Sequence, residues 1–423
     1  MADGESKYVF QSDENIPQGS CVEVQGEING ERIEPTIVVV LEGEEADKAV
    51  KEVREKAAGQ VKEGPAILKD EVTAKMWPAI SKAAAEILYS RKAGRPILLR
   101  FHGDADGICG AFALSGVMYC KTFQQNAAVY SVRDALRDIG NVGQDANPLI
   151  ILLDFASNDA SSAGLELLRA AGIQFMIIDH HPPGEKLPEQ AVSPFCYTGN
   201  GSKYTAGYLG CEIAAACGMD LEKAGSLARV ACAGDKSQIL SSKEKDIEKA
   251  RVLDFLAAHA SFGNSLEFYR KVMDKEELYN SISLQARESI DEAASRVSVK
   301  KSEQEGLTIA TFALDNVVRK GEWPPAGKIT TNIFEDMSGD NPLLCIGYTE
   351  RSVIMRLNDA AAERGLSANE LAKKTVESMA DFVDGGGGHA KAGAVRVKKG
   401  FAKEVLNEIL RQAIDVIKQR EQQ

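Results

Sequence analysis

The sequence predicts an α/β fold: a parallel-sheet domain, a smaller α/β domain at the C-terminus, and a small β-rich appendage at the N-terminus. Its 423 residues are too many for one ordinary domain. From Pro96, continuous apolar segments alternate with helical ones, which is typical of a parallel sheet covered on both faces. A second alternation of this kind begins after residue 300.

The first 65 residues differ in character from the rest. "CVEVQGEING" and "RIEPTIVVVLEGE" are typical of short strands around a turn, and "EEADKAVKEVREKAAG" has helical periodicity. We therefore predict a β-rich appendage over residues 1–65 and an amphipathic helix within 70–94. The main domain is predicted over 66–245, a helical connector over 246–300, and the second α/β domain over 301–423.

The main domain should contain a series of buried strands. "PILLRF", "NPLIILLDFASND" and "IQFMIIDHHPPG" each carry a continuous apolar segment, with helical segments between them. The apolar segment "AAVYSV" at 127–132 is expected to supply a further strand. Alanine-rich helices follow over 204–232 and end at "ACAGDKS".

Composition and charge exclude several classes of protein. No apolar segment approaches the roughly 18 residues that a transmembrane helix needs, and the acidic start "MADGESKYVF" is unlike a signal peptide, so we expect a cytoplasmic location and no membrane contact. A formal net charge of −12 argues against a surface built broadly for nucleic acid, although a local basic channel is compatible with it. Eight scattered cysteines without a C-x-x-C pair predict buried free thiols.

Acidic residues and histidines follow three of the predicted strands. Asp104 and Asp106 follow the first, Asp154 the second, and Asp179 with His180 and His181 the third. The carboxyl ends of parallel strands meet at one edge of a sheet, where ligands usually bind. Carboxylates crowded there repel one another unless a cation lies between them. Carboxylate and imidazole ligands suit Mn²⁺, Mg²⁺ or Zn²⁺.

Each segment also has a simpler interpretation. Asp104 and Asp154 could cap the helices that follow them, and the two histidines could lie in a solvated turn before two prolines. "GGGGHA" at 385–390 could be a flexible linker, although a strand-like segment follows at once. Any one of these interpretations is reasonable alone. All four together, within one array of alternating strands and helices, are much harder to accept.

These motifs, in this order, resemble those of the DHH phosphoesterase superfamily. The resemblance rests on Asp-x-Asp-Gly at 104–107, the strand-ending Asp154, the triplet 179–181, Asp235 in "ACAGDKS", and "GGGGHAKAGA" at 385–394. It spans roughly residues 96–400 and is greatest to the archaeal RecJ-like branch of single-strand nucleases. The glycine-rich motif is similar to that of the DHH-associated C-terminal domain.

The resemblance implies two domains across a cleft and two divalent metal ions, Mn²⁺ or Mg²⁺. The implied metal ligands are Asp104, Asp106, Asp154, His180 and Asp235, with Asp154 bridging the ions. Asp179 would orient His180, and His181 would lie beside the scissile phosphate. Many members place a histidine four residues before the first aspartate, where this chain has Arg100. We expect His102 to act instead as a ligand or phosphate neighbour.

The C-terminal domain is expected to hold the substrate. Glycines let backbone N–H groups approach a phosphate or terminal nucleotide closely, and nearby side chains would add further donors. The residues that we expect to bind substrate are Gly386, Gly387, Gly388, His389, Lys391 and Arg356.

The function that this resemblance implies is a metal-dependent phosphodiesterase that hydrolyses single-stranded DNA or RNA as an exonuclease, by a two-metal mechanism. One alternative is a hydrolase of short oligonucleotides or cyclic dinucleotides, which the net acidity favours. Another is a scaffold subunit of a nucleic-acid complex with little catalytic activity. The N-terminal appendage could bind a protein partner.

Overall fold

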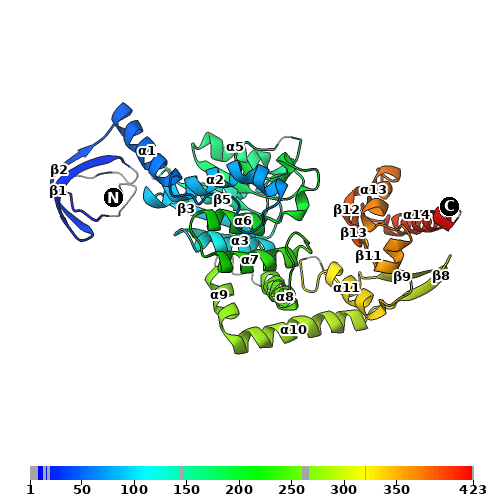
Figure 1. The fold of residues 1–423 in the computed structure, drawn as a ribbon. Helices are drawn as coiled ribbons and strands as arrows, with labels where there is room; N and C mark the ends of the chain where they lie inside the picture. The colour runs from blue at the N-terminus through cyan, green and yellow to red at the C-terminus, as the bar shows by residue number, and fades with distance from the viewer. Residues whose placement is uncertain are drawn as a thin grey trace. The chain divides into compact units, whose positions relative to one another are not determined.

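The structure is a computed structural model that describes residues 8–12, 16, 20–142, 147–185, 187–259, 266–319 and 321–421. It divides into two compact units, Met1–Tyr279 and Asn280–Gln423, each described by itself below (Figure 1). The predicted α/β class is confirmed. The first unit contains a parallel sheet and, ahead of it in sequence, a two-stranded antiparallel hairpin; the second unit contains a mixed sheet.

The N-terminal appendage is a hairpin followed by a helix. Strands β1 (Val22–Asn29) and β2 (Arg32–Val40) pair antiparallel around a turn that contains Gly30, whose φ is +63°. Helix α1 (Gly43–Ala58) then packs on α2 (Glu71–Lys92). Arg54 joins these helices, because its guanidinium pairs with Glu86 and lies 4.0 Å from the ring centroid of Tyr89. The appendage is therefore attached to the first unit through α1.

The sheet of the first unit has the strand order β4-β3-β5-β6-β7, and every pair in it is parallel. Its strands are β3 (Ile97–His102), β4 (Lys121–Gln125), β5 (Leu149–Leu153), β6 (Gln174–Ile178) and β7 (Ala191–Val192). We expected a strand in "AAVYSV" at 127–132. The strand lies earlier, at β4, and the loop that follows it buries Tyr130 in the core instead.

Helices cover both faces of this sheet, as Figure 1 shows. One face packs against α4 (Val132–Val142) and α5 (Ser162–Ala170), and the other against α3 (Ala105–Ser115) and α6 (Ala206–Ala216), with α7 (Leu221–Gly234) beyond them. Helices α3 and α6 cross closely because glycines meet there. A Cβ on Gly110 would lie 3.0 Å from Cα of Gly207. Short 3-10 turns occur at Asp159–Ser161, Pro194–Cys196 and Gly201–Lys203.

The segment predicted as a connector divides between the two units. Helix α8 (Glu244–His259) packs on α7 and α3, and α9 (Leu266–Asp274) packs on α3 and β4, so both belong to the first unit. The boundary between the units, at Tyr279 and Asn280, falls inside α10 (Glu276–Ser295). Apolar residues on α8 that we had assigned to a linker are buried in the first unit.

The second unit contains a six-stranded sheet with the order β12-β13-β11-β10-β9-β8, in which only β9 and β10 pair parallel. Its strands are β8 (Lys300–Gln304), β9 (Leu307–Ala313), β10 (Leu343–Thr349), β11 (Ser352–Leu357), β12 (Val383–His389) and β13 (Ala392–Val397). The glycine-rich segment is therefore strand β12 at one edge of the sheet, rather than a linker.

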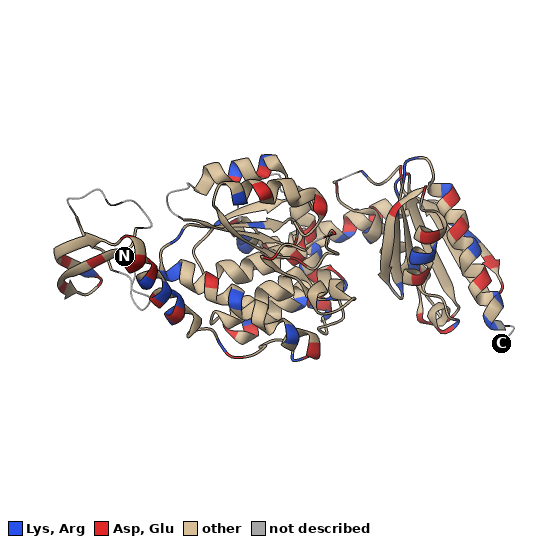
Figure 2. Ribbon diagram, turned by 90° about the horizontal axis from the view of Figure 1, so that it is seen from above, with Lys and Arg blue, Asp and Glu red and all other residues tan. Residues whose placement is uncertain are grey.

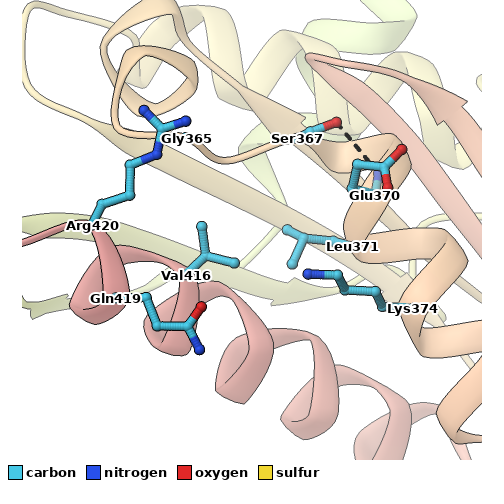
Figure 3. Close-up of a pocket in the computed structure, with 8 residues that line it drawn as sticks. All are labelled: Gly365, Ser367, Glu370, Leu371, Lys374, Val416, Gln419 and Arg420. Carbon is cyan, nitrogen blue, oxygen red and sulfur yellow. Dashed lines mark hydrogen bonds between the residues drawn. The ribbon is translucent and has the colours of Figure 1, made fainter. Parts of the chain in front are cut away.

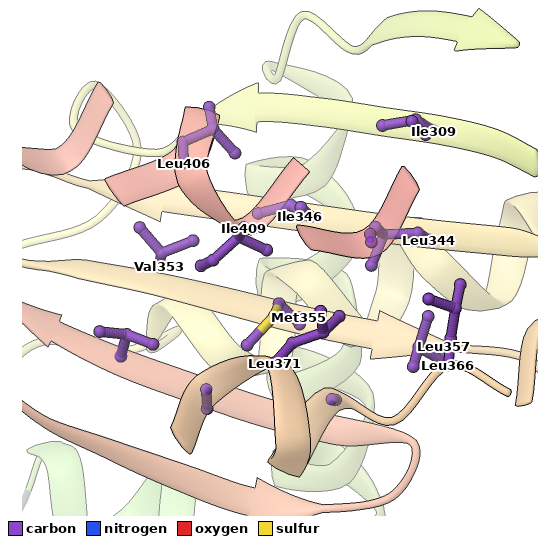
Figure 4. Packing of buried hydrophobic residues seen from close by; sticks show 14 of the residues in the cluster. Ile309, Leu344, Ile346, Val353, Met355, Leu357, Leu366, Leu371, Leu406 and Ile409 are labelled. Atoms are coloured by element: carbon purple, nitrogen blue, oxygen red, sulfur yellow. The ribbon is translucent and has the colours of Figure 1, made fainter. Parts of the chain in front are cut away.

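Each face of this second sheet has its own core. Helices α13 (Ala368–Ser378) and α14 (Ala402–Glu421) cover one face, where Ile346, Met355, Leu371 and Ile409 interlock (Figure 4). Helix α11 (Ala326–Met337) covers the other face, and the short α12 (Asp359–Glu363) follows β11. Two apolar layers thus hold this unit together.

Surface charges of both signs lie side by side along α1 and α14, as Figure 2 shows. Lys51 pairs with Glu55 on α1, and Arg411 pairs with Glu408 and Asp415 on α14. Among the helices in the described ranges, none is both long and apolar enough to cross a lipid bilayer. All eight cysteines are free thiols, and five of them are buried.

Candidate metal centre

Three neighbouring strands of the first sheet bring the predicted site residues to one edge. Strand β3 ends at His102, and Asp154 and Asp179 come directly after β5 and β6. The strands are parallel and in register, with Leu153 level with both Phe101 and Ile178. Their carboxyl ends therefore meet, as the sequence predicted.

Asp104 both caps a helix and faces the site. Its Oδ1 accepts a hydrogen bond from the backbone N–H of Gly107 at 2.9 Å, which makes it the N-cap of α3. Its Oδ2 lies 2.7 Å from Nδ1 of His102. Gly107 has no room for a side chain, because a Cβ would lie 2.3 Å from the carbonyl oxygen of His102. The simpler interpretation of Asp104 and the functional one are thus compatible.

Asp154 lies at the centre of the cluster in a strained backbone conformation. Its φ is +69°, in the left-handed region that aspartate tolerates better than most residues. Its carboxylate lies 3.6 Å from Nδ1 of His102, 3.4 Å from Nε2 of His180 and 3.7 Å from Nδ1 of His181. Strain of this kind is concentrated at functional sites.

His180 is oriented by a backbone carbonyl. Its Nδ1 lies 2.8 Å from the carbonyl oxygen of Ser202, which can only accept a hydrogen bond, so Nδ1 carries a proton. In the neutral ring, Nε2 then has the lone pair that a metal ion would need. Nε2 lies 3.1 Å from Oδ2 of Asp235 and 3.8 Å from Oδ2 of Asp106. Asp235 reaches the cluster from the C-terminal end of α7.

Asp179 orients His181, and our prediction that it orients His180 is wrong. Its Oδ1 lies 2.8 Å from Nδ1 of His181 and also accepts from the backbone N–H of that residue. Its Oδ2 accepts from the backbone N–H of Ser157. Consecutive histidines at the end of a strand point in different directions, and only the second one folds back toward Asp179.

The ligand atoms form three overlapping triplets, in each of which all the atoms lie within 4.8 Å of one another. Asp154 belongs to two of the triplets and His180 to two, and both belong to one of them. They are His102 with Asp104 and Asp154, Asp154 with His180 and His181, and Asp106 with His180 and Asp235. The five residues predicted as ligands and the two histidines predicted as catalytic, His102 and His181, are therefore brought together.

Burial gives this cluster its unusual electrostatics. Burial and the neighbouring carboxylates raise the pKa of Asp106 well above its ordinary value, and the same two causes raise the pKa of Asp154. Burial disfavours charge on His102, but Asp104 and Asp154 together raise its pKa to about 11. Burial and mutual repulsion thus disfavour negative charge on Asp106 and Asp154 when no cation is present.

Several buried polar atoms of the cluster have no hydrogen-bond partner within the described ranges. They are Oδ2 of Asp106, Oδ1 of Asp154, Nε2 of His180 and Oγ of Ser157. Buried polar groups are normally paired, so a set of unpaired ones needs an explanation. Carboxylate oxygens and an imidazole nitrogen that face one another fit a divalent cation.

Residues outside the predicted set support the ligands. The backbone N–H of Gly207 on α6 donates to Oδ1 of Asp106 at 3.1 Å, and Oδ1 of Asp254 on α8 accepts from the N–H of Ala105 at 2.9 Å. Ser202 supplies the carbonyl that holds His180. These contacts join positions about 20 to 150 residues apart through main-chain atoms, so no side-chain motif could have identified them.

The predicted substrate-binding residues lie in the second unit. Gly386, Gly387 and Gly388 belong to the edge strand β12, and a Cβ on Gly388 would lie 2.2 Å from the carbonyl oxygen of Ala392. The side chain of His389 is outside the described part of the structure. Lys391 pairs with Asp359, while Arg356 donates to Oγ1 of Thr331 at 3.0 Å and to the carbonyl of Gly327 on α11. Their role in substrate binding stays a prediction.

The second unit also has a hollow of about 300 Å³ between α13 and α14 (Figure 3). Lys374 and Arg420 border it, above the apolar side chains of Leu371 and Val416. None of the site residues predicted from the sequence lines this hollow.

The first-unit sheet corresponds to a known family. Residues 96–234 match the model of the DHH family, N-terminal domain. The uncharacterized protein MJ1198 of Methanocaldococcus jannaschii is 26% identical over an alignment that covers 96% of this chain and 64% of the relative. The chain therefore spans less than two thirds of the length of that relative.

Two solved structures share the fold. The DHH domain of PF0399, described as a member of the s1p family of ribosomal proteins, is 24% identical with a TM-score of 0.69, over 88% of this chain and 98% of that one. RecJ from Thermus thermophilus in complex with Mn²⁺ is 14% identical with a TM-score of 0.51, over 86% of this chain and 59% of that one. At these identities the likeness concerns the fold alone.

Proposed function

Because residues 96–234 form a DHH-family domain, we propose that this chain is a metal-dependent phosphodiesterase that cleaves single-stranded nucleic acid as an exonuclease. One observation carries the proposal most directly. Three buried atoms of types that can ligate a metal, on Asp106, Asp154 and His180, face one another without hydrogen-bond partners in the described residues. A polar cluster of this kind suits a cation better than it suits the protein alone.

The residues proposed to hold two divalent ions are Asp104, Asp106, Asp154, His180 and Asp235. Asp154 takes part in two of the three triplets through carboxylate oxygens, which supports a bridging position. Bound ions would supply the positive charge that neutralises a phosphodiester and stabilises the charge that develops on it during hydrolysis. RecJ of Thermus thermophilus, which has this fold, was solved with Mn²⁺, so Mn²⁺ is the first ion to test.

His181 is proposed to contact the scissile phosphate. Its side chain is 46% exposed, in contrast to that of His180, and its Nδ1 is bound to Asp179. Burial disfavours a charge on this ring, but Asp179 raises its pKa. The free Nε2 can therefore donate a hydrogen bond to a phosphate oxygen, with Asp179 keeping the ring in place. His102 is proposed as a further ligand or phosphate neighbour.

The second unit is proposed to hold the rest of the substrate. Glycines 386–388 expose the backbone of an edge strand, where N–H groups can meet a phosphate. Arg356 carries guanidinium N–H groups beyond those bound to α11, and Lys391 has a partner in Asp359 that a phosphate could replace. His389 completes the proposed set.

The test is hydrolysis of end-labelled DNA and RNA oligonucleotides of several lengths, with Mn²⁺ and with chelator. We expect products that shorten stepwise from one end, only when metal is present. An inactive chain that still binds single strands would favour the scaffold alternative. Products released from the interior of a long strand would contradict the exonuclease assignment.

A hydrolase of short oligonucleotides or cyclic dinucleotides is the second candidate. The net charge of −12 favours it, because a long polyanion is repelled by an acidic surface more strongly than a dinucleotide is. Comparing kcat/KM for a 20-mer and for a dinucleotide separates the two candidates. A strong preference for the dinucleotide would replace the polymer assignment.

A further inference from the structure

Two side-chain amides lie at the same sheet edge as the candidate metal centre, on the side of β4. Gln124 is the last residue but one of β4, and Asn126 directly follows the strand. Strand β4 pairs parallel with β3, with Gln125 level with His102. The backbone N–H of Gly103 donates to the carbonyl of Gln125 at 2.9 Å. The amides therefore stand beside the loop that carries His102 and Asp104.

Gly103 makes room for these amides. A Cβ on this residue would lie 2.5 Å from Nε2 of Gln124 and 2.6 Å from Oδ1 of Asn126, so a side chain here would displace both amides. Gly103 separates His102 from Asp104, two of the residues proposed at the metals. The amide pair thus lies directly against the backbone of the site.

A chain of hydrogen bonds fixes the direction of both amides. The hydroxyl of Tyr269 on α9 donates to Oε1 of Gln124, and Nε2 of Gln124 donates to Oδ1 of Asn126 at 2.7 Å. Tyr269 is 2% exposed, and burial raises its pKa, so it remains a neutral donor. With its oxygen engaged, Asn126 points its Nδ2 donors elsewhere, and among the described residues Nδ2 has no partner.

We infer that Asn126 contacts the substrate through Nδ2, by donating to an uncharged acceptor on the base or sugar of the nucleotide next to the scissile phosphate. This inference rests on the proposed nuclease function. Asn126 is exposed and carries no charge, and neutral amides are among the side chains that donate to acceptors on bases and sugars. Gln124 and Tyr269 are positioning residues that act through Asn126.

The experiment compares Michaelis constants for a single-stranded oligonucleotide in the presence of Mn²⁺. N126A should raise KM about fivefold to tenfold, the loss expected for one neutral hydrogen bond, while kcat changes less than about twofold. Y269F should raise KM about twofold to threefold, because Asn126 is then held less firmly. In the N126A background Y269F should have no further effect, since both act through one contact.

Matched variants make the result specific. N332A removes another side-chain amide, a half-buried one that bonds to Asp291 in the second unit, and should leave KM unchanged. If Y269F is unstable by circular dichroism, Q124M breaks the same chain of hydrogen bonds at a half-buried residue. A wild-type chain without metal-dependent hydrolysis would overturn the proposed function and this inference together. An active chain in which N126A keeps the wild-type KM, or in which Y269F and N126A act additively, would overturn this inference alone.

Discussion

Two buried polar groups of the first unit lie close together in sequence and differ in one respect. Around Arg100 in β3, every charge is paired: its guanidinium donates to both carboxylate oxygens of Asp138 and to Gln125, and Tyr130 also donates to Asp138. Two residues further on, His102 opens a cluster in which Asp106, Asp154 and His180 all keep atoms without a hydrogen-bond partner among the described residues.

This difference distinguishes a buried network that stabilises the fold from a buried cluster that is suited to bind a ligand. Arg100 and Asp138 are 2% and 0% exposed, and their network is complete without any other molecule. It includes Arg100, four residues before Asp104, so this chain uses that position for packing. At the strand ends, Asp106, Asp154 and His180 are comparably buried, but their hydrogen bonding is incomplete. Incomplete pairing of buried charge costs stability, and a fold retains it where a ligand completes it.

The largest expected effect comes from the incomplete cluster. D154N should lower Mn²⁺-dependent hydrolysis about 1,000-fold, several kcal/mol of transition-state stabilisation, because it removes the central carboxylate. Asparagine tolerates the left-handed backbone at this position, so the fold should persist. Steady-state rates with circular dichroism check both statements. Activity within tenfold of wild type would show that Asp154 is not at the reaction centre.

Disrupting the complete network around Arg100 should instead lower stability without abolishing metal binding. D138N leaves the buried Arg100 without its counter-charge and should lower the free energy of unfolding by about 3 kcal/mol or more. Urea denaturation measures this loss. Metal-dependent stabilisation should persist in D138N, since Asp138 contacts none of the proposed ligands in the described structure. A D138N variant as stable as wild type would contradict the structural role.

Metal should stabilise the folded chain even without substrate. An ion at 100 times its Kd adds about 2.7 kcal/mol, which raises the melting temperature by about 5 °C for a unit of this size. The increase should appear with Mn²⁺ in wild type and D138N, and should vanish in D154N. Differential scanning calorimetry in Mn²⁺ and in chelator gives the comparison. Equal shifts in wild type and D154N would place the ion elsewhere.

The smallest expected effect concerns Glu408, a surface carboxylate whose hydrogen-bond partners are supplied by the protein. Hydrogen bonds from Arg411 and then from Gln412 lower the pKa of Glu408 to about 2, against the partial burial that would raise it. Its contribution is therefore present above the unfolded pKa near 4.5 and is lost as the pH falls toward 2. E408Q should lose less stability than wild type over that pH range. The difference should be under about 1 kcal/mol, because solvent screens the pair. Thermal melts at pH 6 and pH 3 measure it, and an unchanged slope would contradict the pairing.

The sequence predicted the elements that bring the site together because strand periodicity is local. Asp104, Asp154 and Asp179 were placed at one edge from three apolar segments and the rule that parallel strands end together, and the structure bears out that arrangement. The "AAVYSV" strand was misplaced because an apolar segment that buries Tyr130 from a loop has the same composition as a strand. Burial alone does not specify backbone conformation.

Contacts between distant residues could not be predicted in the same way. Asp138 pairs with Arg100 across 38 positions, and Asp254 bonds to Ala105 across 149. Whether Asp179 holds His180 or His181 depends on how the chain turns after β6, which the sequence does not reveal. These contacts arise only when the sheet and its covering helices are assembled, and they decide which buried charges are paired.

Calorimetric titration of Mn²⁺ into the chelator-treated chain, in parallel with D154N, tests most directly whether the unpaired atoms at the strand ends form a metal site. We predict two ions bound per wild-type chain and the loss of that binding in D154N, with D138N binding as wild type does. Wild-type protein that takes up no Mn²⁺, or a D154N variant that binds it with unaltered affinity and stoichiometry, would contradict this prediction.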